Sequence, residues 1–492
     1  MAASEEILIV GSGFAGLGMG IRLKQAGMND FTILEQASDL GGTWRDNRYP
    51  GAACDVESHL YSFSFEQNPR WTRMFAPQQE ILDYLEHCAD KYGLRPHLRF
   101  NTSVVGATFS ESNGLWEVRC SDGSTRRARV VIAACGGLSR PSTPDIPGLN
   151  RFAGPVFHSA RWDHTCDLTG KTVAIIGTGA SAIQIVPAIA SDVAKLHVFQ
   201  RTPPWILPKA DRDLTSGEQK RFERLPVLQR LARLAQYWRH ELIALGFVVN
   251  PKLLKLASRL ALRYLKESVP DAALRAKLTP TYTMGCKRVL LSNDYYPALQ
   301  RENVELVTSG IEEIRAHSIV TSDGVERPID ALVLATGFYA AEAVAPFDVK
   351  GRAGQELNEA WRDGPEAYLG TAVAGFPNMF LLVGPNTGLG HSSMVFMIES
   401  QLEYVMGCLH HLREQHLHSI EVKAEAQARY NTELQERLPR TVWATGCSSW
   451  YQTRTGRNTT LWPGFTFEYR FRTRRFDPAD YELVEGLRSA AA

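Results

Sequence analysis

Short, continuous runs of hydrophobic residues open the chain. Glu6–Val10 and Phe31–Leu34 are two such runs, and Leu17–Gly27 lies between them. Continuous apolar runs of this length are typical of parallel strands that are buried on both faces. The pattern therefore predicts a strand, a helix over Leu17–Gly27 and a second strand.

The same order of elements recurs near residue 170. Lys171–Ile176 and Lys195–Gln200 are apolar runs, and the stretch from about Ser181 to Ala190 between them is predicted as a helix. Asp211–Lys277 differs, because it has no strand signals and carries apolar residues at helical spacing with many basic residues between them. The two units predict an α/β fold with two Rossmann-like dinucleotide-binding domains, and the strand-free stretch predicts a helical insertion in the second.

A glycine-rich turn follows the first strand of the first unit. It reads GSGFAG, and the next strand ends at an acid 19 residues later. Glycines allow the tight turn, the close approach of a pyrophosphate and close helix–strand packing, while the acid can accept hydrogen bonds from ribose hydroxyls. A plain glycine-rich turn would leave this acid unexplained. The residues expected at the first nucleotide are Gly11, Gly13, Ala15, Gly16 and Glu35.

The second unit has the turn GTGASA, in which alanine replaces the third glycine. Its following strand ends in Arg201-Thr202, with no acid. A carboxylate would repel a 2′-phosphate, whereas a guanidinium can bind it through two hydrogen bonds. The pattern favours NADPH over NADH, unless Arg201 is simply a surface arginine. The residues expected at the second nucleotide are Gly177, Thr178, Gly179, Ala180, Ser181, Gln184, Arg201 and Thr202.

Two further motifs point to a family. Gly41-Gly42-Thr43-Trp44 resembles the loop that runs beside FAD in flavoprotein monooxygenases, and Phe152–Asp163 (FAGPVFHSARWD) lies between the two glycine-rich turns. The second stretch matches Phe-x-Gly-x-x-x-His-x-x-x-Trp-(Pro or Asp) and resembles the fingerprint of type I (class B) Baeyer–Villiger monooxygenases. Related amine and sulfide monooxygenases usually end this pattern in Tyr or Phe, so Trp162-Asp163 favours the Baeyer–Villiger family.

The resemblance covers the chain from Ile7 to about Phe467 and implies FAD at the first unit and NADPH at the second. It implies that reduced FAD adds O2 to give a C4a-peroxyflavin, which attacks a ketone and yields an ester or lactone. Arg288 would keep this anion deprotonated as a permanent cation, and Asp55 would fix its guanidinium. Further implied contacts are Gly42, Thr43, Trp44, Asp55, Tyr61, Val104 and Met394 for FAD, and Lys287 and Arg288 for NADP.

The resemblance also implies how the chain divides. Leu332–Phe338 resembles the segment that returns such chains to their FAD domain, and Asn378–Asn386 resembles a segment that closes the FAD site. We expect the first part of the FAD-binding domain at 1–145 and the NADP-binding domain at 146–332, with the insertion at about 211–277. The second part of the FAD-binding domain, with C-terminal substrate and cofactor loops, is expected at 333–492. His158 is expected to couple domain movement to cofactor binding.

Length and composition indicate the number of domains, the classes of partner and the state of the cysteines. A chain of 492 residues needs two or three domains, and a net charge of +1 gives no general case for binding nucleic acid or a membrane. No apolar run approaches the about 20 residues that span a bilayer, and no signal-peptide pattern is present, so we expect a cytoplasmic protein. The eight cysteines lack Cys-x-x-Cys spacing and are expected to be reduced thiols. No metal site is expected.

The sequence leaves alternatives open. A flavin sulfide or amine oxygenase is disfavoured by Trp162-Asp163 together with Asp55 and Arg288. A flavin disulfide reductase needs a cysteine pair, and Cys54 has no partner before Cys88. A non-catalytic flavin-binding protein would not need the cations at 201, 287 and 288 together. The insertion fits a cap over a substrate channel, although a basic amphipathic helix can also lie on a membrane. The type of ketone, the oligomeric state and the roles of residues 442–464 stay open.

Overall fold

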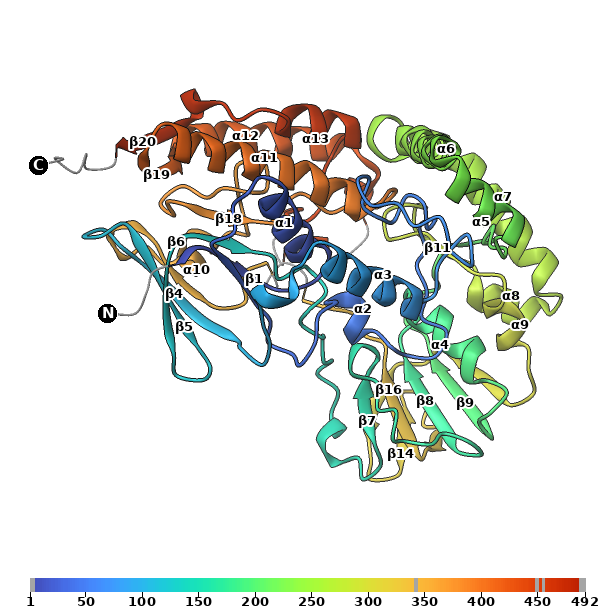
Figure 1. Ribbon diagram of the computed structural model, residues 1–492. Helices are drawn as coiled ribbons and strands as arrows, with labels where there is room; N and C mark the ends of the chain where they lie inside the picture. Colours follow the sequence, from blue (N-terminus) through green and yellow to red (C-terminus); the bar gives the residue numbers. More distant parts are fainter. Residues whose placement is uncertain (1–4, 340–343, 447–450, 454–455, 486–492) are drawn as a thin grey trace, which may run out of the picture.

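The computed structural model describes residues 5–339, 344–446, 451–453 and 456–485. Its larger sheet has eight strands in the order β17-β4-β5-β6-β1-β2-β3, with β18 also paired to β6 (Figure 1). The strands from β6 to β3 are parallel, and β4 and β5 extend them in antiparallel fashion. The strands are β1 (Glu5–Val10), β2 (Phe31–Leu34), β3 (Leu98–Arg99), β4 (Val104–Ser110), β5 (Leu115–Cys120), β6 (Thr125–Ala133), β17 (Asp348–Lys350) and β18 (Met379–Leu381).

The second sheet lies below and to the right of the first in Figure 1. Its five strands are all parallel and run in the order β12-β9-β8-β16-β7. A small antiparallel sheet, β13-β14-β15, follows β12 in the chain. The strands are β7 (Val156–His158), β8 (Thr172–Ile176), β9 (Lys195–Phe199), β12 (Val304–Val307), β13 (Ile311–Ile314), β14 (Ser318–Thr321), β15 (Glu326–Pro328) and β16 (Ala331–Leu334).

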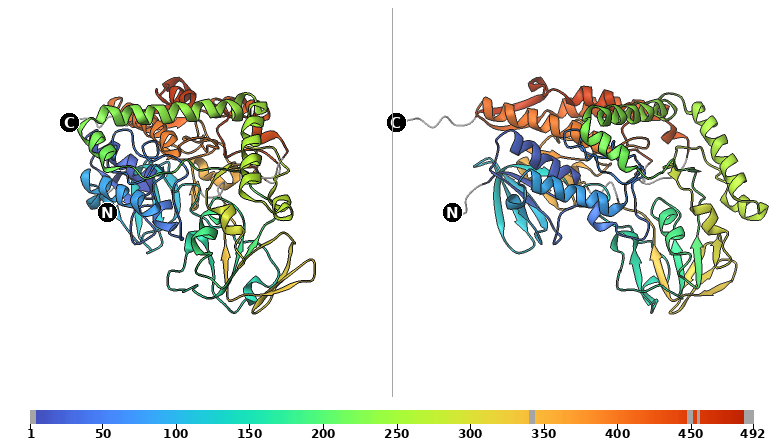
Figure 2. Two further views of the ribbon diagram at one scale, coloured as in Figure 1. Left: turned by 90° about the vertical axis from the view of Figure 1, so that its right-hand side faces the viewer. Right: turned by 45° about the vertical axis from the view of Figure 1, so that its right-hand side comes forward.

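A helical segment leaves the second unit and returns to it. The short strands β10 (Ile206–Leu207) and β11 (Leu290–Leu291) pair with each other on either side of this excursion. Figures 1 and 2 show its two long helices as an arc along the outer edge of the molecule. The helices are α5 (Ser216–Arg224), α6 (Pro226–Ala244), the π-helix η4 (Leu245–Val249), α7 (Leu254–Ser268) and α8 (Ala272–Leu278).

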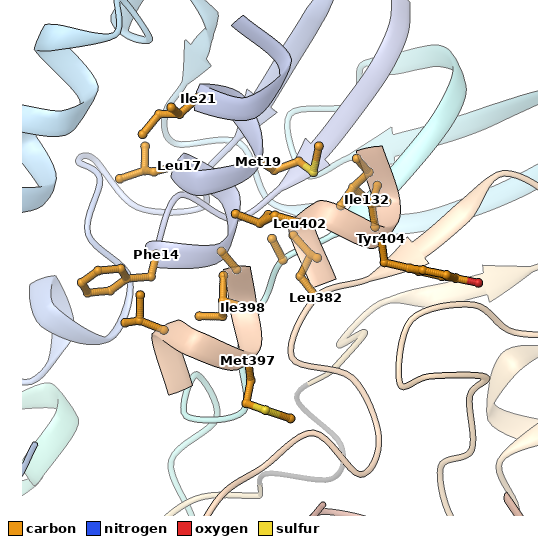
Figure 3. Packing of buried hydrophobic residues seen from close by; sticks show 14 of the residues in the cluster. Phe14, Leu17, Met19, Ile21, Ile132, Leu382, Met397, Ile398, Leu402 and Tyr404 are labelled. Carbon is orange, nitrogen blue, oxygen red and sulfur yellow. The ribbon is translucent and has the colours of Figure 1, made fainter. Parts of the chain in front are cut away.

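The main core joins the two ends of the chain. α1 (Phe14–Gln25) packs against α11 (Met394–Glu414) above the larger sheet. Figure 3 shows side chains of both helices, among them Phe14, Ile398 and Leu402, in one packed cluster. A Cβ at Gly18 would lie 2.8 Å from the Leu402 side chain, so the glycine lets the two helices approach closely. The C-terminal segment is therefore part of the first unit.

The remaining elements are short or lie at the edges. They are α2 (Thr43–Asp46), α3 (Gln78–Lys91), α4 (Ala182–Ile189), α9 (Tyr295–Leu299), α10 (Leu357–Ala360), α12 (Ala424–Arg437), α13 (Thr466–Thr473), β19 (Leu417–Val422) and β20 (Tyr481–Glu485). The 3-10 helices are η1 (Arg95–His97), η2 (Leu149–Arg151), η3 (Ser159–Arg161), η5 (Pro251–Leu253), η6 (Arg352–Gly354), η7 (Leu438–Arg440), η8 (Val442–Ala444) and η9 (Pro478–Asp480).

The predicted α/β fold with two Rossmann-like units is confirmed. The predicted first helix starts three residues too late, because the glycine turn leads directly into α1 at Phe14. The proposed boundary after residue 332 falls inside β16, which ends at Leu334 and belongs to the second sheet. No helix in the described parts of the chain is long and apolar enough to cross a membrane.

The expectation of reduced cysteines is correct for six residues and wrong for one. Cys286 is disulfide-bonded. Sequence spacing could not reveal this bond, because a disulfide depends on which residues the fold brings together. Cys447 lies outside the described residues. The free thiols are Cys54, Cys88, Cys120, Cys135, Cys166 and Cys408.

Candidate active site

The first glycine turn has a backbone that only glycine fits. Gly11 has φ +104°, and a Cβ there would lie 2.6 Å from the carbonyl oxygen of Ala134. A Cβ at Gly16 would lie 1.9 Å from the carbonyl oxygen of Gly11. Gly13 then starts α1 without any side-chain cap, so the free N–H groups of the first turn are available to a phosphate.

Two predicted motifs assemble around this turn. Gly42 has φ +53°, and its missing Cβ would lie 3.0 Å from the Cα of Gly13, so the two glycine segments touch. Glu35 is buried and accepts hydrogen bonds from the Ser12 amide (3.0 Å) and hydroxyl (2.7 Å). Arg45 forms an ion pair with the same carboxylate at 3.0 Å. These contacts hold the carboxylate beside the turn, where a ribose would lie.

Trp44, Tyr61 and Phe14 form an aromatic group next to the turn. The Trp44 indole donates a hydrogen bond to the Tyr61 hydroxyl at 3.2 Å, and the Tyr61 ring packs edge-on against Phe14 with centroids 5.3 Å apart. Burial raises the pKa of Tyr61, so it stays neutral. Thr43 begins α2, directly before Trp44. The group gives a flat ligand an apolar, hydrogen-bonded wall.

Two predicted FAD contacts lie at different places. Met394 begins α11 and is half-buried against the main core that includes Phe14. Val104 begins β4 and packs with Val10 and Leu34 in a second cluster. Ala15 is buried within the first turn of α1. Val104 therefore does not join the aromatic group.

The second glycine turn repeats the first. Gly177 has φ +116°, and a Cβ there would lie 2.3 Å from the carbonyl oxygen of Ala335. Gly179 and Ala180 are exposed, and no atom lies within 4 Å of a Cβ built on Gly179. Ser181 precedes α4 without capping it, and the Thr178 hydroxyl donates to the Thr202 carbonyl at 3.1 Å. This turn also leaves helix N–H groups and open space for a phosphate.

Two cations lie beside the second turn. Arg201 is exposed, and Lys287 is half-buried with its ammonium 5.1 Å from the centroid of the Tyr282 ring. Burial lowers the pKa of Lys287, and the nearby charge of Arg201 lowers it further. Within the part of the chain that the structure describes, neither residue forms an ion pair with a carboxylate. Two neighbouring cations without a counter-charge suit a phosphate dianion.

Gln184 joins the two units. Its amide nitrogen donates to the Ala53 carbonyl at 3.0 Å, and its oxygen accepts from the Tyr49 hydroxyl at 2.8 Å. A Cβ at Gly51 would lie 2.7 Å from the Gln184 carbonyl oxygen, so the loop lies directly on α4. Sequence reasoning assigned Gln184 to the nucleotide, whereas its side chain here binds the loop that carries Asp55.

Asp55 and Arg288 meet at this junction. The Arg288 Nε donates to Oδ2 of Asp55 and Nη2 donates to Oδ1, both at 2.8 Å. Burial opposes ionisation of Asp55, but the charge and hydrogen bonds of Arg288, together with the charge of Lys209, lower the Asp55 pKa overall. The charge of Asp55 raises the Arg288 pKa. The Arg288 side chain is 33% exposed and the Asp55 side chain 29%, so a ligand can reach the pair. The geometry predicted for the two residues is present.

A second polar group lies behind this pair, and sequence reasoning missed it. The ring nitrogens of His240, on α6, lie 2.8 Å from a Glu57 carboxylate oxygen and 2.7 Å from the His391 carbonyl oxygen. Arg239 also pairs with Glu57, which is buried. The inner face of α6 is thereby fixed to the loop that holds Asp55. The only sequence signal was the polar run Gly388–Met394, which contains His391.

His391 is the least satisfied polar side chain of the junction. It is buried, and neither ring nitrogen has a hydrogen-bond partner among the residues that the structure describes. Burial, with the charges of His240 and Arg288, lowers its pKa to about 3. The Phe247 ring lies 5.8 Å from the His391 ring and 6.2 Å from the Trp443 ring. The Trp443 indole nitrogen also has no partner in the described part of the chain. Buried polar atoms without partners are rare in proteins, so these nitrogens indicate a ligand position.

The fingerprint stretch lies at the link between the sheets. His158 ends β7, and its Nε2 lies 3.0 Å from the Gly337 carbonyl oxygen while Nδ1 accepts from the Ala160 amide at 3.1 Å. Burial lowers the His158 pKa. The Asp163 side chain accepts hydrogen bonds from the amide and the hydroxyl of Thr165, two residues away. These contacts tie the segment entering the second unit to the segment leaving it.

Two other expectations concern a redox cysteine pair and a metal site. Cys54 is a free thiol beside Asp55, and burial raises its pKa to about 12, so it is not part of a redox cysteine pair. No group of three His, Cys, Asp or Glu side chains that could hold a metal occurs among the residues described. Residues 447–450 and 454–455 of the C-terminal loop segment lie outside the described ranges.

Known proteins resemble this chain over nearly its whole length. The family model "Pyridine nucleotide-disulphide oxidoreductase" matches residues 8–229. An oxidized steroid monooxygenase bound to NADP is 32% identical, with a TM-score of 0.88 over 98% of this chain and all of that one. A complex of OTEMO with FAD and NADP is 29% identical, with a TM-score of 0.88 over 98% of this chain and all of that one.

A Baeyer–Villiger monooxygenase of Pseudomonas aeruginosa is 51% identical over 481 residues, which cover 97% of this chain and 91% of that protein. About half of the aligned residues are thus identical in the two chains. A shared two-nucleotide fold alone does not require so high an identity. The family suggested by the fingerprint stretch is confirmed, and the chain belongs to the Baeyer–Villiger monooxygenases.

Proposed function

We propose that this enzyme uses NADPH and O2, with bound FAD, to convert a ketone to an ester or lactone. In the overall reaction, ketone, O2, NADPH and a proton give ester, NADP⁺ and water. The observation that carries the proposal is the two-fold hydrogen-bonded pair of Asp55 and Arg288 at the junction of the two nucleotide units. Arginine does not lose its proton in proteins, so Arg288 supplies a constant positive charge there.

The cofactor assignments rest on the chain's own residues. The uncapped start of α1 and the Glu35 carboxylate suit the pyrophosphate and ribose of FAD. The uncapped start of α4, with Arg201 and Lys287, suits the 2′-phosphate of NADPH. Bound FAD, once reduced by NADPH, supplies the activation of O2.

The protein's part of the chemistry is electrostatic. Arg288 stabilises negative charge on the reacting oxygen, and a fixed donor of this kind contributes roughly 3–4 kcal/mol to lowering a barrier. Asp55 holds the guanidinium in one orientation through both of its oxygens. The permanent cation disfavours a protonated oxidant, and this charge state separates attack on a ketone from oxidation of sulfur or nitrogen.

We further propose that His391 orients the ketone. A pKa of about 3 keeps the imidazole neutral at physiological pH, where one nitrogen can donate a hydrogen bond and the other can accept one. The charge of Arg288 contributes to the lowered His391 pKa, so the two side chains are near each other. Within the described ranges, no residue partners the two His391 ring nitrogens. Phe247 and Trp443 provide apolar walls beside it. We expect His391→Leu to raise the ketone KM while leaving the NADPH KM unchanged.

The test is oxygen transfer itself. Purified holoenzyme, NADPH and a panel of linear, cyclic and aryl ketones are incubated under ¹⁸O2, and products are analysed by mass spectrometry. The proposal predicts ester or lactone that contains one ¹⁸O atom, and no such product under nitrogen. Parallel incubations replace the ketone with a sulfide or an amine, and oxidation of these without any ketone-derived ester would instead support the alternative flavin oxygenase.

A further inference from the structure

Helix α6 buries several polar side chains and exposes a row of apolar ones. Gln229 donates to the Asn68 carbonyl, Arg233 donates to three backbone carbonyls, and Glu241 accepts from Thr466. The outward positions follow a spacing of three or four residues and lie on one face of the helix. They are Val227, Leu231, Leu234, Trp238 and Leu242, which are 57%, 55%, 49%, 49% and 66% exposed.

This stripe continues onto neighbouring helices. The Trp238 ring lies 6.2 Å from the ring of Phe467 on α13, and the same helix carries Phe471, which is 79% exposed. Beyond η4, Leu253, Leu256 and Leu260 are also at least half exposed. Figure 2 shows α6 and α7 at the outer edge of the molecule in both views. We call these ten side chains, five on α6, two on α13 and three at η5 and α7, the outer apolar face.

Positive charge accompanies the outer apolar face. Residues 216–278 contain 13 Lys or Arg and 5 Asp or Glu, a net charge of +8, so the rest of the chain carries −7 to reach the total of +1. Between residues 225 and 262 the single acid is Glu241, which is buried. Exposed cations on this stretch without an ion pair among the described residues are Arg230, Lys252, Lys255 and Arg259.

The cations are placed beside the apolar stripe. Lys252, Lys255 and Arg259 each directly precede one of the exposed leucines at 253, 256 and 260. The two sets form adjacent rows, one basic and one apolar. A helix of this kind places its apolar row at the acyl boundary of a bilayer and its basic row among anionic headgroups.

We propose that the outer apolar face binds the enzyme to the surface of an anionic lipid bilayer. A second copy of the chain is a poorer partner, because a two-fold contact would bring two segments of charge +8 together. An anionic bilayer satisfies both the apolar and the basic rows. The whole-chain charge of +1, from which no membrane partner was expected, conceals this local excess.

Vesicle sedimentation tests the proposal. The FAD-loaded enzyme is mixed with vesicles of phosphatidylcholine alone or of phosphatidylcholine with phosphatidylglycerol. We expect binding to the anionic vesicles only, weakened by salt. The triple variant Leu234→Gln, Leu242→Gln, Phe471→Gln should bind at least about tenfold more weakly, because it loses apolar transfer to the bilayer. The triple variant Lys252→Gln, Lys255→Gln, Arg259→Gln should lose the preference for anionic vesicles.

A matched control replaces exposed apolar residues elsewhere. Val105→Gln with Val325→Gln alters two side chains that are each 44% exposed, and its vesicle binding should equal that of the wild type. FAD content and ketone turnover in free solution should be unchanged in all three variants. Light scattering after gel filtration tests whether a second copy of the chain binds to the outer apolar face instead. A wild-type dimer that the apolar triple variant converts to a monomer, or failure to bind anionic vesicles, would overturn the proposal.

Discussion

The two nucleotide units have nearly the same backbone and opposite electrostatics. Gly11 and Gly177 have φ of +104° and +116°, and each has a backbone carbonyl where a Cβ would lie. The strand after the first turn ends in buried Glu35, whereas the strand after the second ends in exposed Arg201. We propose that the turns bind the two dinucleotides and that the residues at the strand ends select which dinucleotide binds to each unit.

The junction between the units brings together Asp55 and Arg288, which come from different parts of the chain. The loop that carries Asp55 belongs to the first unit and lies on α4 of the second through Gln184. Arg288 comes from the segment that returns from the helical excursion. The proposed chemistry therefore depends on how the units meet, and changes in one unit should affect one cofactor while changes at the junction affect turnover.

The largest effect is expected from the glycines. Gly11→Ala should abolish FAD retention, because a Cβ would clash with the Ala134 carbonyl and φ is strained. Gly177→Ala should leave the FAD content unchanged and weaken NADPH binding by about 100-fold or more. FAD absorbance after purification and NADPH titration measure the two. Gly217→Ala, whose Cβ would meet nothing closer than 3.8 Å, is the neutral control. Loss of FAD from both glycine variants alike would contradict the division of roles.

A smaller effect is expected from Arg201. Arg201→Ala should raise the KM for NADPH by roughly 10- to 100-fold, the value of one or two charged hydrogen bonds, and leave the KM for NADH unchanged. Steady-state kinetics with both nucleotides measure this. Arg301→Ala, another exposed arginine, should change neither. Equal KM changes for NADPH and NADH would contradict a contact between Arg201 and the 2′-phosphate.

The smallest effect is expected from Gln184. Gln184→Ala removes two hydrogen bonds between α4 and the Asp55 loop and should lower stability by about 1–2 kcal/mol. Hydrogen exchange should become faster in residues 49–55, with FAD content unchanged. Gln184→Glu keeps the acceptor for Tyr49, so its stability should lie between those of the wild type and Gln184→Ala. An unchanged loop with weaker NADPH binding would instead return Gln184 to a direct nucleotide contact.

Much of this arrangement followed from the sequence, because it depends on local chemistry. The apolar runs placed β2 correctly at Phe31–Leu34, and the glycine spacing predicted both turns. The Asp55–Arg288 pair came from family resemblance, since no spacing rule links residues 233 positions apart.

The features that the sequence did not predict depend on tertiary contacts. His391 and its partner His240 come from segments 151 residues apart, and nothing in either segment predicts their meeting. The Cys286 disulfide was missed for the same reason. The reversed polarity of α6 was hidden because a helical period shows that a helix has two faces, but not which one is buried.

The central claim is that Arg288 serves oxygen transfer and not flavin reduction. Arg288→Ala and Arg288→Lys can be compared with the wild type by following FAD bleaching with NADPH under nitrogen, and then ester formation from the best ketone in air. In Arg288→Ala we expect bleaching at a rate within about threefold of wild type and ester formation reduced at least about 100-fold. A normal ester yield from Arg288→Ala would contradict it.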